Sequence, residues 1–256
     1  MASVAPQPLS FTSELAVSRL KLADGSTTTL HVARFDRATV RPQVMLLPGS
    51  QPLSTWCAAE DVCDAIVGGF FARPAGTPLG ELRIGGIPLQ SIPFDSPWHA
   101  VRSCVHIDGG AIRLAPRWAI AAEPDGDVLQ AGPLLVQAGA ARINAGVDPE
   151  GFSAGARQFD SDITRGRYPR AALALAGEDL LAVVCDGRAE DDAGLTLAEL
   201  AGALVELGAE DAINLDGGGS ASLVVGGRLR NRPREEHGVP IPAGRPIATA
   251  IAFVPV

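Results

Sequence analysis

The sequence is poor in the features that mark a membrane protein. No apolar run approaches the roughly 18 residues that a helix needs to cross a bilayer. The N-terminal segment MASVAPQPLSFTSEL also lacks the basic start and continuous apolar stretch of a secretory signal. We therefore expect no membrane association. We expect a cytoplasmic protein as the chain is given, or a secreted or periplasmic one if the chain is a trimmed mature form.

Positive charge is scarce as well. The 21 Lys and Arg residues include a single lysine, Lys21, and 29 Asp and Glu residues outnumber them, for a formal net charge of -8. An acidic surface repels the phosphate backbone of DNA or RNA, so we expect no nucleic-acid partner. A few arginines focused on one cleft can still hold a phosphate, because guanidinium pairs bidentately with its oxygens.

Cysteine and histidine are few and dispersed. The four cysteines form no CxxC pair and have no histidine at metal-ligand spacing, so we predict no metal site and no cofactor, leaving a bound divalent cation open. A disulfide between Cys57 and Cys63 is possible in an exported protein, but free buried thiols are the interpretation we favour. We assign no role to His31, His99, His106 and His237.

Glycine (29) and proline (20) are abundant and lie between short apolar runs, as is typical of strand-rich folds with many turns. We expect one domain over residues 1–256, with a strand-rich part at about 1–60 and a motif-bearing part at about 60–256. The predicted elements in its first half are strands at 18–22, 27–35 and 43–48, a helix at 56–64, and a hairpin at 104–114 that turns at Asp108-Gly109-Gly110.

The C-terminal part is more legible. Two apolar strands, 171–176 and 180–186, flank a turn at 177–179, and pairing Ala176 with Leu180 would set Arg170 opposite Asp186. A helix follows at 196–207, with Thr196 and Glu199 as a capping box. The next strand, 212–216, completes a strand–helix–strand crossover. The sequence thus predicts an α+β fold: a mixed sheet with a β-hairpin, one such crossover, and helices packed on the sheet.

This crossover has a chemical consequence. Parallel strands end at the same sheet edge, which would bring Asp186 and Asp216 to the edge where ligands usually bind. The glycine-rich run 217–220 follows Asp216 directly, and its backbone N–H groups could cradle an anion. A further hairpin over Gly226-Gly227 would return Asn231 and Arg232 to the same edge.

These residues also carry a family resemblance. The stretch INLDGGGSASLVV (213–225), followed by NRP at 231–233, resembles the phosphodiester glycosidases. VGGFF at 67–71 with its following PLG, PRAALAL at 169–175 and CDGR at 185–188 resemble further segments of that family in the same order. The similar region spans roughly residues 60–235. Val67 departs from the usual Asn, and Ala171 from the common Thr.

The resemblance implies hydrolysis of the bond between an anomeric carbon and a phosphodiester oxygen, with release of free sugar. A small-molecule or glycan phosphodiester would be the substrate; the sequence leaves the oligomeric state unknown. Two carboxylates suit glycosyl transfer, and Asp186 and Asp216 are the catalytic candidates. The predicted substrate-binding residues are Arg170, Asn214, Gly217, Gly218, Gly219, Ser220, Arg232, Gly68, Gly69 and Arg188.

Other interpretations remain open at this stage. Asp216 before three glycines and Asp186 before Gly187 could each simply form a turn. Arg170 could form an ordinary cross-strand ion pair, and Arg188 could be a solvated surface residue. Two rival functions belong to other classes. One is a metal-dependent phosphodiesterase that uses the two aspartates with Asp160 or Asp162 as ligands. The other is a non-catalytic protein that binds glycan phosphates, which the departure at Val67 would suit.

Overall fold

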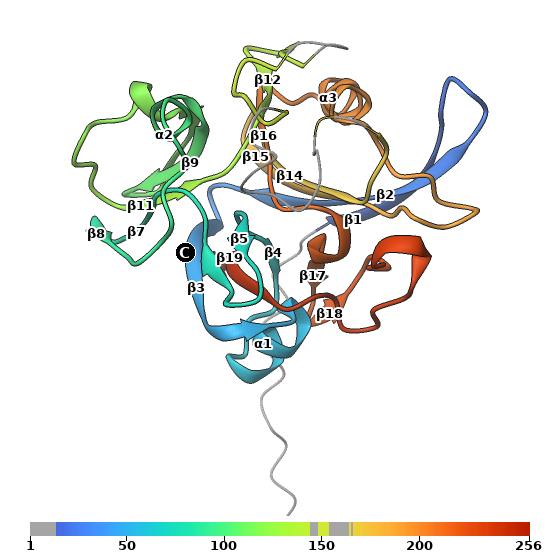
Figure 1. The fold of residues 1–256 in the computed structure, drawn as a ribbon, viewed down its shortest axis with the longest axis horizontal. Helices are drawn as coiled ribbons and strands as arrows, with labels where there is room; N and C mark the ends of the chain where they lie inside the picture. The colour runs from blue at the N-terminus through green and yellow to red at the C-terminus, as the bar shows by residue number, and fades with distance from the viewer. Residues whose placement is uncertain (1–13, 144–147, 154–163, 165) are drawn as a thin grey trace, which may run out of the picture.

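The computed structural model describes residues 14–143, 148–153, 164 and 166–256 (Figure 1). Its main sheet has seven strands in the order β1 (Glu14–Lys21), β2 (Thr27–Asp36), β15 (Asp179–Cys185), β14 (Arg170–Ala176), β16 (Asp211–Asn214), β12 (Leu134–Gln137) and β13 (Ala140–Ala141). The helix α3 (Leu197–Glu206) packs on β12, β13 and β16, and Figure 1 shows it above this sheet.

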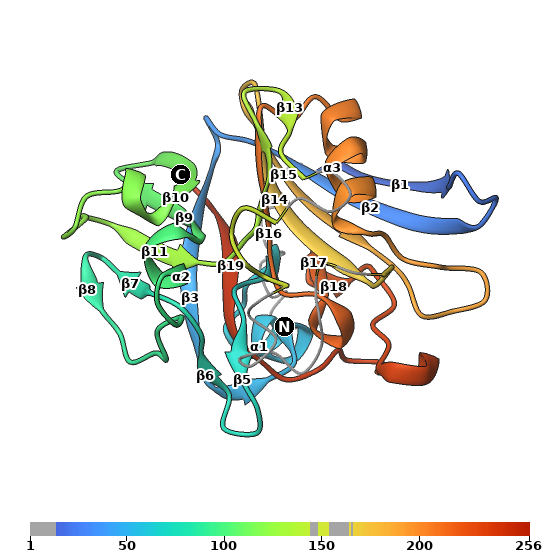
Figure 2. The ribbon, with the colours of Figure 1, turned by 45° about the horizontal axis from the view of Figure 1, so that its top comes forward.

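Two further sheets have five strands each. One runs β18 (Arg228–Leu229), β17 (Leu223–Val225), β4 (Ala65–Val67), β19 (Ile247–Pro255) and β3 (Val40–Gln51). The other runs β10 (Ala111–Pro116), β9 (Ser103–Asp108), β11 (Asp127–Gln130), β7 (Leu82–Ile84) and β8 (Ile87–Pro88). The long strands β3 and β19 lie side by side in both views (Figure 2).

Short elements complete the chain. β5 (Phe71–Ala72) pairs with β6 (Thr77–Pro78). The remaining helices of the described residues are α1 (Leu53–Ala59), α2 (Trp98–Val101) and the 3₁₀ turns η1 (Arg117–Ala119), η3 (Gly218–Ser220) and η4 (Glu236–Gly238). The fold is broadly α+β and mostly sheet. Among the described helices, none has the length and apolar character needed to cross a bilayer.

The seven-stranded sheet is apolar on both faces, and the alternation along β14 shows why. Ala171, Leu173 and Leu175 point into the larger core cluster, which they share with β3, β4 and β19. Ala172 and Ala174 point the other way, into the cluster under α3. A strand buried on both faces reads as a continuous apolar run, and this one does. The larger cluster draws on both predicted parts of the chain; that the whole is one domain stays a prediction.

Several predicted elements are confirmed. β1 and β2 form the expected hairpin, with Gly25 at φ 86° in its turn, and β9 pairs with β10 as expected at 104–114. The helix α3 begins after Thr196, whose side chain and that of Glu199 form the complete capping box. The hairpin over Gly226-Gly227 pairs Val225 with Arg228, as predicted.

Three predictions are wrong in detail. The helix expected at 56–64 is α1, which begins right after Pro52 and ends before Asp61, a residue at positive φ. The sheet is not mixed, since the named strands of the described residues pair antiparallel. The reason is that β14 lies between β15 and β16 and runs antiparallel to both, so the two strands joined through α3 never pair with each other.

The third correction concerns the β14–β15 register. Ala176 pairs with Asp179 rather than Leu180, so Arg170 faces Cys185 and not Asp186. The turn is one residue tighter than the apolar pattern indicated, because Asp179 itself belongs to the strand and its carboxylate pairs with Arg34 at 2.7 Å. A shift of one residue reverses the face of every side chain. Arg170 therefore lies on the α3 face, and Asp186 lies on the opposite one.

Candidate active site

The two predicted catalytic aspartates lie beyond the ends of β15 and β16. Both strands run antiparallel to β14, so both end where β14 begins, at Arg170. Asp186 directly follows β15, and Asp216 follows β16 by two residues. They share one edge of the sheet with β14 between them, but their surroundings differ sharply.

Asp186 is buried in a network of hydrogen bonds and is 2% exposed. Its Oδ2 lies 2.9 Å from Nε2 of His31, and its Oδ1 accepts the backbone N–H of Arg232 at 2.6 Å. Burial opposes ionisation of this carboxyl, but the hydrogen bonds from His31 and the Arg232 N–H outweigh it and lower the pKa of Asp186. The residue is thus a fixed anion whose oxygens already have partners.

Asp216 is in a different state. Its N–H donates to the carbonyl of Gly68 at 3.0 Å, and its Oδ1 accepts the N–H of Gly217 at 2.9 Å. The residue keeps some contact with solvent. Desolvation by the surrounding protein raises the pKa of Asp216 to about 6, against the lowering influence of Ser220, Arg245 and the Gly217 N–H. The Ser220 hydroxyl acts on this carboxylate although it lies outside hydrogen-bond geometry. Asp216 can therefore exchange a proton near neutral pH.

The glycine-rich loop after Asp216 brings other groups close. A Cβ on Gly217 would lie 2.9 Å from the Pro169 carbonyl, and one on Gly219 would lie 3.0 Å from both Nη2 of Arg245 and Oε1 of Glu235. Three N–H groups of the run 217–220 already donate within the protein, to Asp216, Pro169 and Gly217. The loop's main effect in this structure is to admit neighbouring side chains rather than to aim its own donors at a ligand.

Two arginines approach this loop. Arg188, held at φ 59°, donates from Nη1 to the Arg234 carbonyl at 3.1 Å, and its guanidinium would lie about 3.4 Å from a Cβ on Gly218. Arg245 donates from its N–H to Gly219 at 3.2 Å and from Nε to Glu235 at 2.6 Å. Burial, and then the charge of Arg245, lower the pKa of Arg188. Two guanidinium groups that repel each other in this way favour anions beside them, and Glu235 is one that the protein itself supplies.

The other predicted arginines are engaged elsewhere. Arg170 is 3% exposed and donates from Nε to the Leu195 carbonyl at 3.0 Å. Arg232 has a half-exposed side chain that pairs with Asp192 at 2.5 Å and also lies 3.5 Å from Asp186 and 3.7 Å from Asp191. Its charge is offset by three carboxylates.

The remaining predicted residues are packed. Asn214 is 1% exposed, and its Nδ2 donates to the carbonyls of Gly132 and Leu215, both at 2.9 Å. Gly68 allows close packing against Thr249, since a Cβ there would lie 2.5 Å from its hydroxyl, and the Gly69 N–H donates to the same hydroxyl at 3.0 Å. Val67 is fully buried in β4.

Sequence reasoning missed His31, Glu235, Arg245 and Tyr168. Both Arg170 and Arg188 lie over the Tyr168 ring, at 5.2 and 5.7 Å from its centroid. No periodic pattern marks these four residues, because tertiary packing alone brings them to the site. A clue for His31 was its place in β2, which the hairpin pattern had predicted and which turns out to neighbour β15.

The site combines a carboxyl that can be protonated with nearby arginines on an antiparallel α+β fold, which is a site suited to acid–base chemistry. Comparison with known proteins gives the family. The family model of the phosphodiester glycosidases matches residues 62–254, and the chain belongs to this family. The match extends the similarity that the motifs indicated past residue 235, through Arg245 and into β19.

Solved structures show the same fold. The zebrafish N-acetylglucosamine-1-phosphodiester alpha-N-acetylglucosaminidase catalytic domain, auto-inhibited by its pro-peptide, is 20% identical with a TM-score of 0.70, over 94% of this chain and 82% of that one. A hypothetical protein from Synechocystis is 19% identical with a TM-score of 0.64, over 93% and 61%. A putative exported protein from Burkholderia pseudomallei is 17% identical with a TM-score of 0.63, over 90% and 74%. No curated protein sequence matches the chain.

Proposed function

We propose that the protein hydrolyses the glycosidic bond of a sugar-1-phosphate diester and releases free sugar. The observation that carries the proposal is the placement of Asp216, whose pKa is about 6, beside a loop that Arg188 and Arg245 approach. Family membership supports a glycosidase acting on phosphodiesters. The zebrafish enzyme's name makes N-acetylglucosamine-1-phosphodiesters the first substrates to test.

The proposed division of labour follows from the carboxyl environments. Asp216 carries the mobile proton, and Glu235, whose pKa is lowered chiefly by its hydrogen bonds from Arg245, stays ionised. Two carboxyls with pKa values pushed apart suit an acid and a base. In the step, the bond between the anomeric carbon and the phosphate oxygen breaks and a water oxygen bonds to that carbon. The water proton passes to Glu235, while Asp216 protonates the departing phosphate.

The arginines would stabilise the departing phosphate. A phosphate leaves as an anion. A cationic donor at its oxygens therefore lowers the barrier to bond cleavage more than a neutral hydrogen-bond donor does. Arg188 is better suited than Arg232, because three carboxylates already surround Arg232, whereas burial and then the neighbouring cation Arg245 lower the pKa of Arg188. Asp186 as a second catalytic carboxylate stays a prediction, which its buried hydrogen bonds do not favour.

Product analysis in heavy-oxygen water tests the reaction. The substrate is the methyl diester of N-acetylglucosamine-1-phosphate, beside the corresponding glucose diester. We expect free sugar with the heavy oxygen on its anomeric carbon. Label in the phosphate would instead indicate P–O cleavage and, with loss of activity on chelation, the metal-dependent phosphodiesterase. Saturable binding without turnover would indicate the binding protein. Asp160 and Asp162, the further ligands considered for a metal, lie outside the described residues.

The Asp216→Asn variant assigns the role of the carboxyl. We expect sugar release to fall about 100-fold or more while diester binding persists, because proton transfer belongs to the transition state. Asp211→Asn is the matched control, since Asp211 lies at the other end of β16. Normal turnover by Asp216→Asn would refute its catalytic role.

A further inference from the structure

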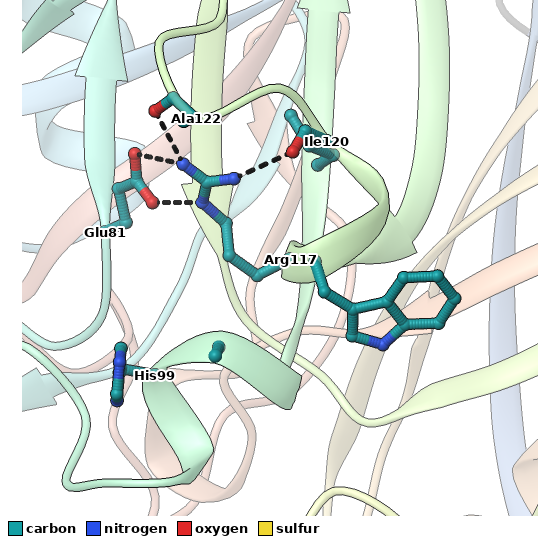
Figure 3. Close-up of a pocket in the computed structure, with 7 residues that line it drawn as sticks. Glu81, His99, Arg117, Ile120 and Ala122 are labelled. Carbon is teal, nitrogen blue, oxygen red and sulfur yellow. Dashed lines mark hydrogen bonds and ion pairs between the residues drawn. The ribbon is translucent and has the colours of Figure 1, made fainter.

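A hollow of about 470 Å³ lies on the side of the molecule that carries the β9–β10 sheet, between α2 and η1. Its lining includes Glu81, His99, Arg117, Trp118, Ile120 and Ala122. Figure 3 shows His99 on the helix side and Arg117 with Glu81 on the other. This volume is within the range of small-molecule sites. No residue of the proposed active site lines it.

The hollow is electrically neutral, and its arginine has no donor to offer. Arg117 uses its guanidinium on Glu81 and on the carbonyls of Ile120, Ala121 and Ala122, the last three at 3.1, 2.9 and 3.0 Å (Figure 3). A second bond to Glu81, at 3.3 Å, brings the total to five, so all five N–H groups of the Arg117 guanidinium have acceptors. A phosphate would find no free guanidinium here.

Glu81 remains an acceptor within this cluster. It also receives Nε of Arg83 at 2.7 Å, and Arg83 reaches Glu123 at 2.9 Å, so two arginines and two carboxylates balance. Burial opposes ionisation of Glu81, yet the hydrogen bonds from Arg117 and Arg83 lower its pKa. An ionised carboxylate with two oxygens has room for a further hydroxyl donor, and its side chain is 25% exposed.

Trp118 gives the hollow an apolar wall. The residue is 72% exposed, although indole is among the side chains that gain most from burial. The turn η1, which carries Trp118, is held firmly, because Ala115 and Ile120 on either side of it are buried in a cluster with Cys104 and Val128. The helix opposite is anchored too, since Gln130 donates to the His99 carbonyl at 2.9 Å. A flat apolar ring held in solvent beside hydrogen-bonding groups matches a ligand that is apolar on its face and polar at its edge.

We propose that this hollow is an accessory site for a neutral glycan, with a pyranose ring stacked on Trp118 and its hydroxyls bonded to Glu81 and His99. The C–H groups of a pyranose face give it the apolar surface, and its hydroxyls give the polar edge. Charge balance around Arg117 disfavours an anionic ligand. Other ligands with an apolar face and a polar edge would fit the same description, and the choice of a sugar among them rests on the proposed function. Gln130 connects the accessory site to the Asp216 region, because its N–H donates to the backbone carbonyl of Glu81 and its own carbonyl lies close to Gly69.

The test measures binding of phosphate-free oligosaccharides, namely chitotriose, mannotriose and maltotriose, to the full chain by calorimetry and tryptophan fluorescence. Trp56 is buried and Trp98 is half-buried, so a change in acrylamide quenching reports chiefly on Trp118. We expect saturable binding of at least one trisaccharide, weakened about tenfold or more in Trp118→Ala, since losing an aromatic platform costs about 1.4 kcal/mol or more. Ile87→Ala is the matched control, an exposed apolar residue of the same sheet outside the hollow.

Two results would overturn the proposal: no binding of any of the three trisaccharides at millimolar concentration, or equal binding by Trp118→Ala and the unchanged protein. Preference for the phosphorylated form of a trisaccharide, lost with Trp118, would contradict the neutral character of the site. The measurement is repeated on Asp216→Asn, which lacks the proposed catalytic proton. Trisaccharide binding there supports the accessory site even if no diester is ever hydrolysed, so the two proposals fail separately.

Discussion

At the scale of single residues, the two arginines next to the candidate site behave differently. Replacing Arg188 with Gln should raise KM for the diester about tenfold or more while the melting temperature stays the same or rises, because burial and then Arg245 already disfavour its charge. Arg232→Gln should have the reverse effect, lowering the melting temperature with little change in KM, since it frees Asp186, Asp191 and Asp192 from their shared cation. Initial rates and thermal scans on both variants measure this. Equal KM values would remove Arg188 from the site.

Substitution of Asp186 tests whether this buried carboxylate serves catalysis or the stability of the fold. Asp186→Asn keeps the shape but leaves His31 and the Arg232 N–H without their charged acceptor, and we expect a loss of about 3 kcal/mol in the free energy of unfolding. Urea unfolding measures it. The fraction that is folded should turn over diester at close to the normal rate. A stable variant with no turnover would restore Asp186 as a catalytic residue.

At the scale of elements, α3 is the one most fully specified by its own sequence. The capping box satisfies orphan N–H groups at both Thr196 and Glu199, so Thr196→Ala should cost about 1 kcal/mol in unfolding free energy. Thr196→Ser retains the hydroxyl and should lose only a few tenths of that amount. Chemical denaturation distinguishes the two. Because α3 lies on the face opposite Asp186, kcat should be unchanged in both variants.

The same comparison shows what sequence can determine. The hairpins and α3 follow from local turn and capping chemistry, and their places in the chain were predicted correctly, although the register of the β14–β15 hairpin was wrong by one residue. The order of the strands could not be predicted, because insertion of β14 between β15 and β16, or of β19 between β4 and β3, depends on contacts distant in the chain. The site divides in the same way. Asp216 followed from a local motif, whereas Glu235 and Arg245 reach the loop through the segment between β18 and β19, which has no strand and only the short turn η4. A one-residue error in register placed Arg170 opposite Asp186.

At the scale of the whole molecule, ionising Asp216 works against folding. Its pKa is about 6 in the folded protein and 3.8 ordinarily, so the folded state binds a proton that the unfolded state has released between these values. The contribution of Asp216 to stability is therefore fully present below pH 3.8 and is lost as pH rises through about 6.

Asp216→Asn should accordingly be more stable than the unchanged protein above pH 6, with the advantage shrinking as pH falls towards 4. Melting temperatures of the two proteins over this pH range measure the difference. A difference independent of pH would show that the carboxyl is not perturbed. If Asp216 is the acid, kcat/KM should decline over the same interval as pH rises.

The position of β19 in its sheet has a consequence for folding during synthesis. This strand, Ile247–Pro255, is inserted between β4 and β3, whose residues precede it by about 180 positions or more, and Arg245 stands two residues before it. During translation the ribosome delivers those earlier strands long before their central partner exists. Until β19 is released, β3 and β4 have no strand between them, and the segment that carries Arg245 into β19 has no fixed place beside the glycine loop. The proposed site is thus incomplete until residue 255 has been synthesised.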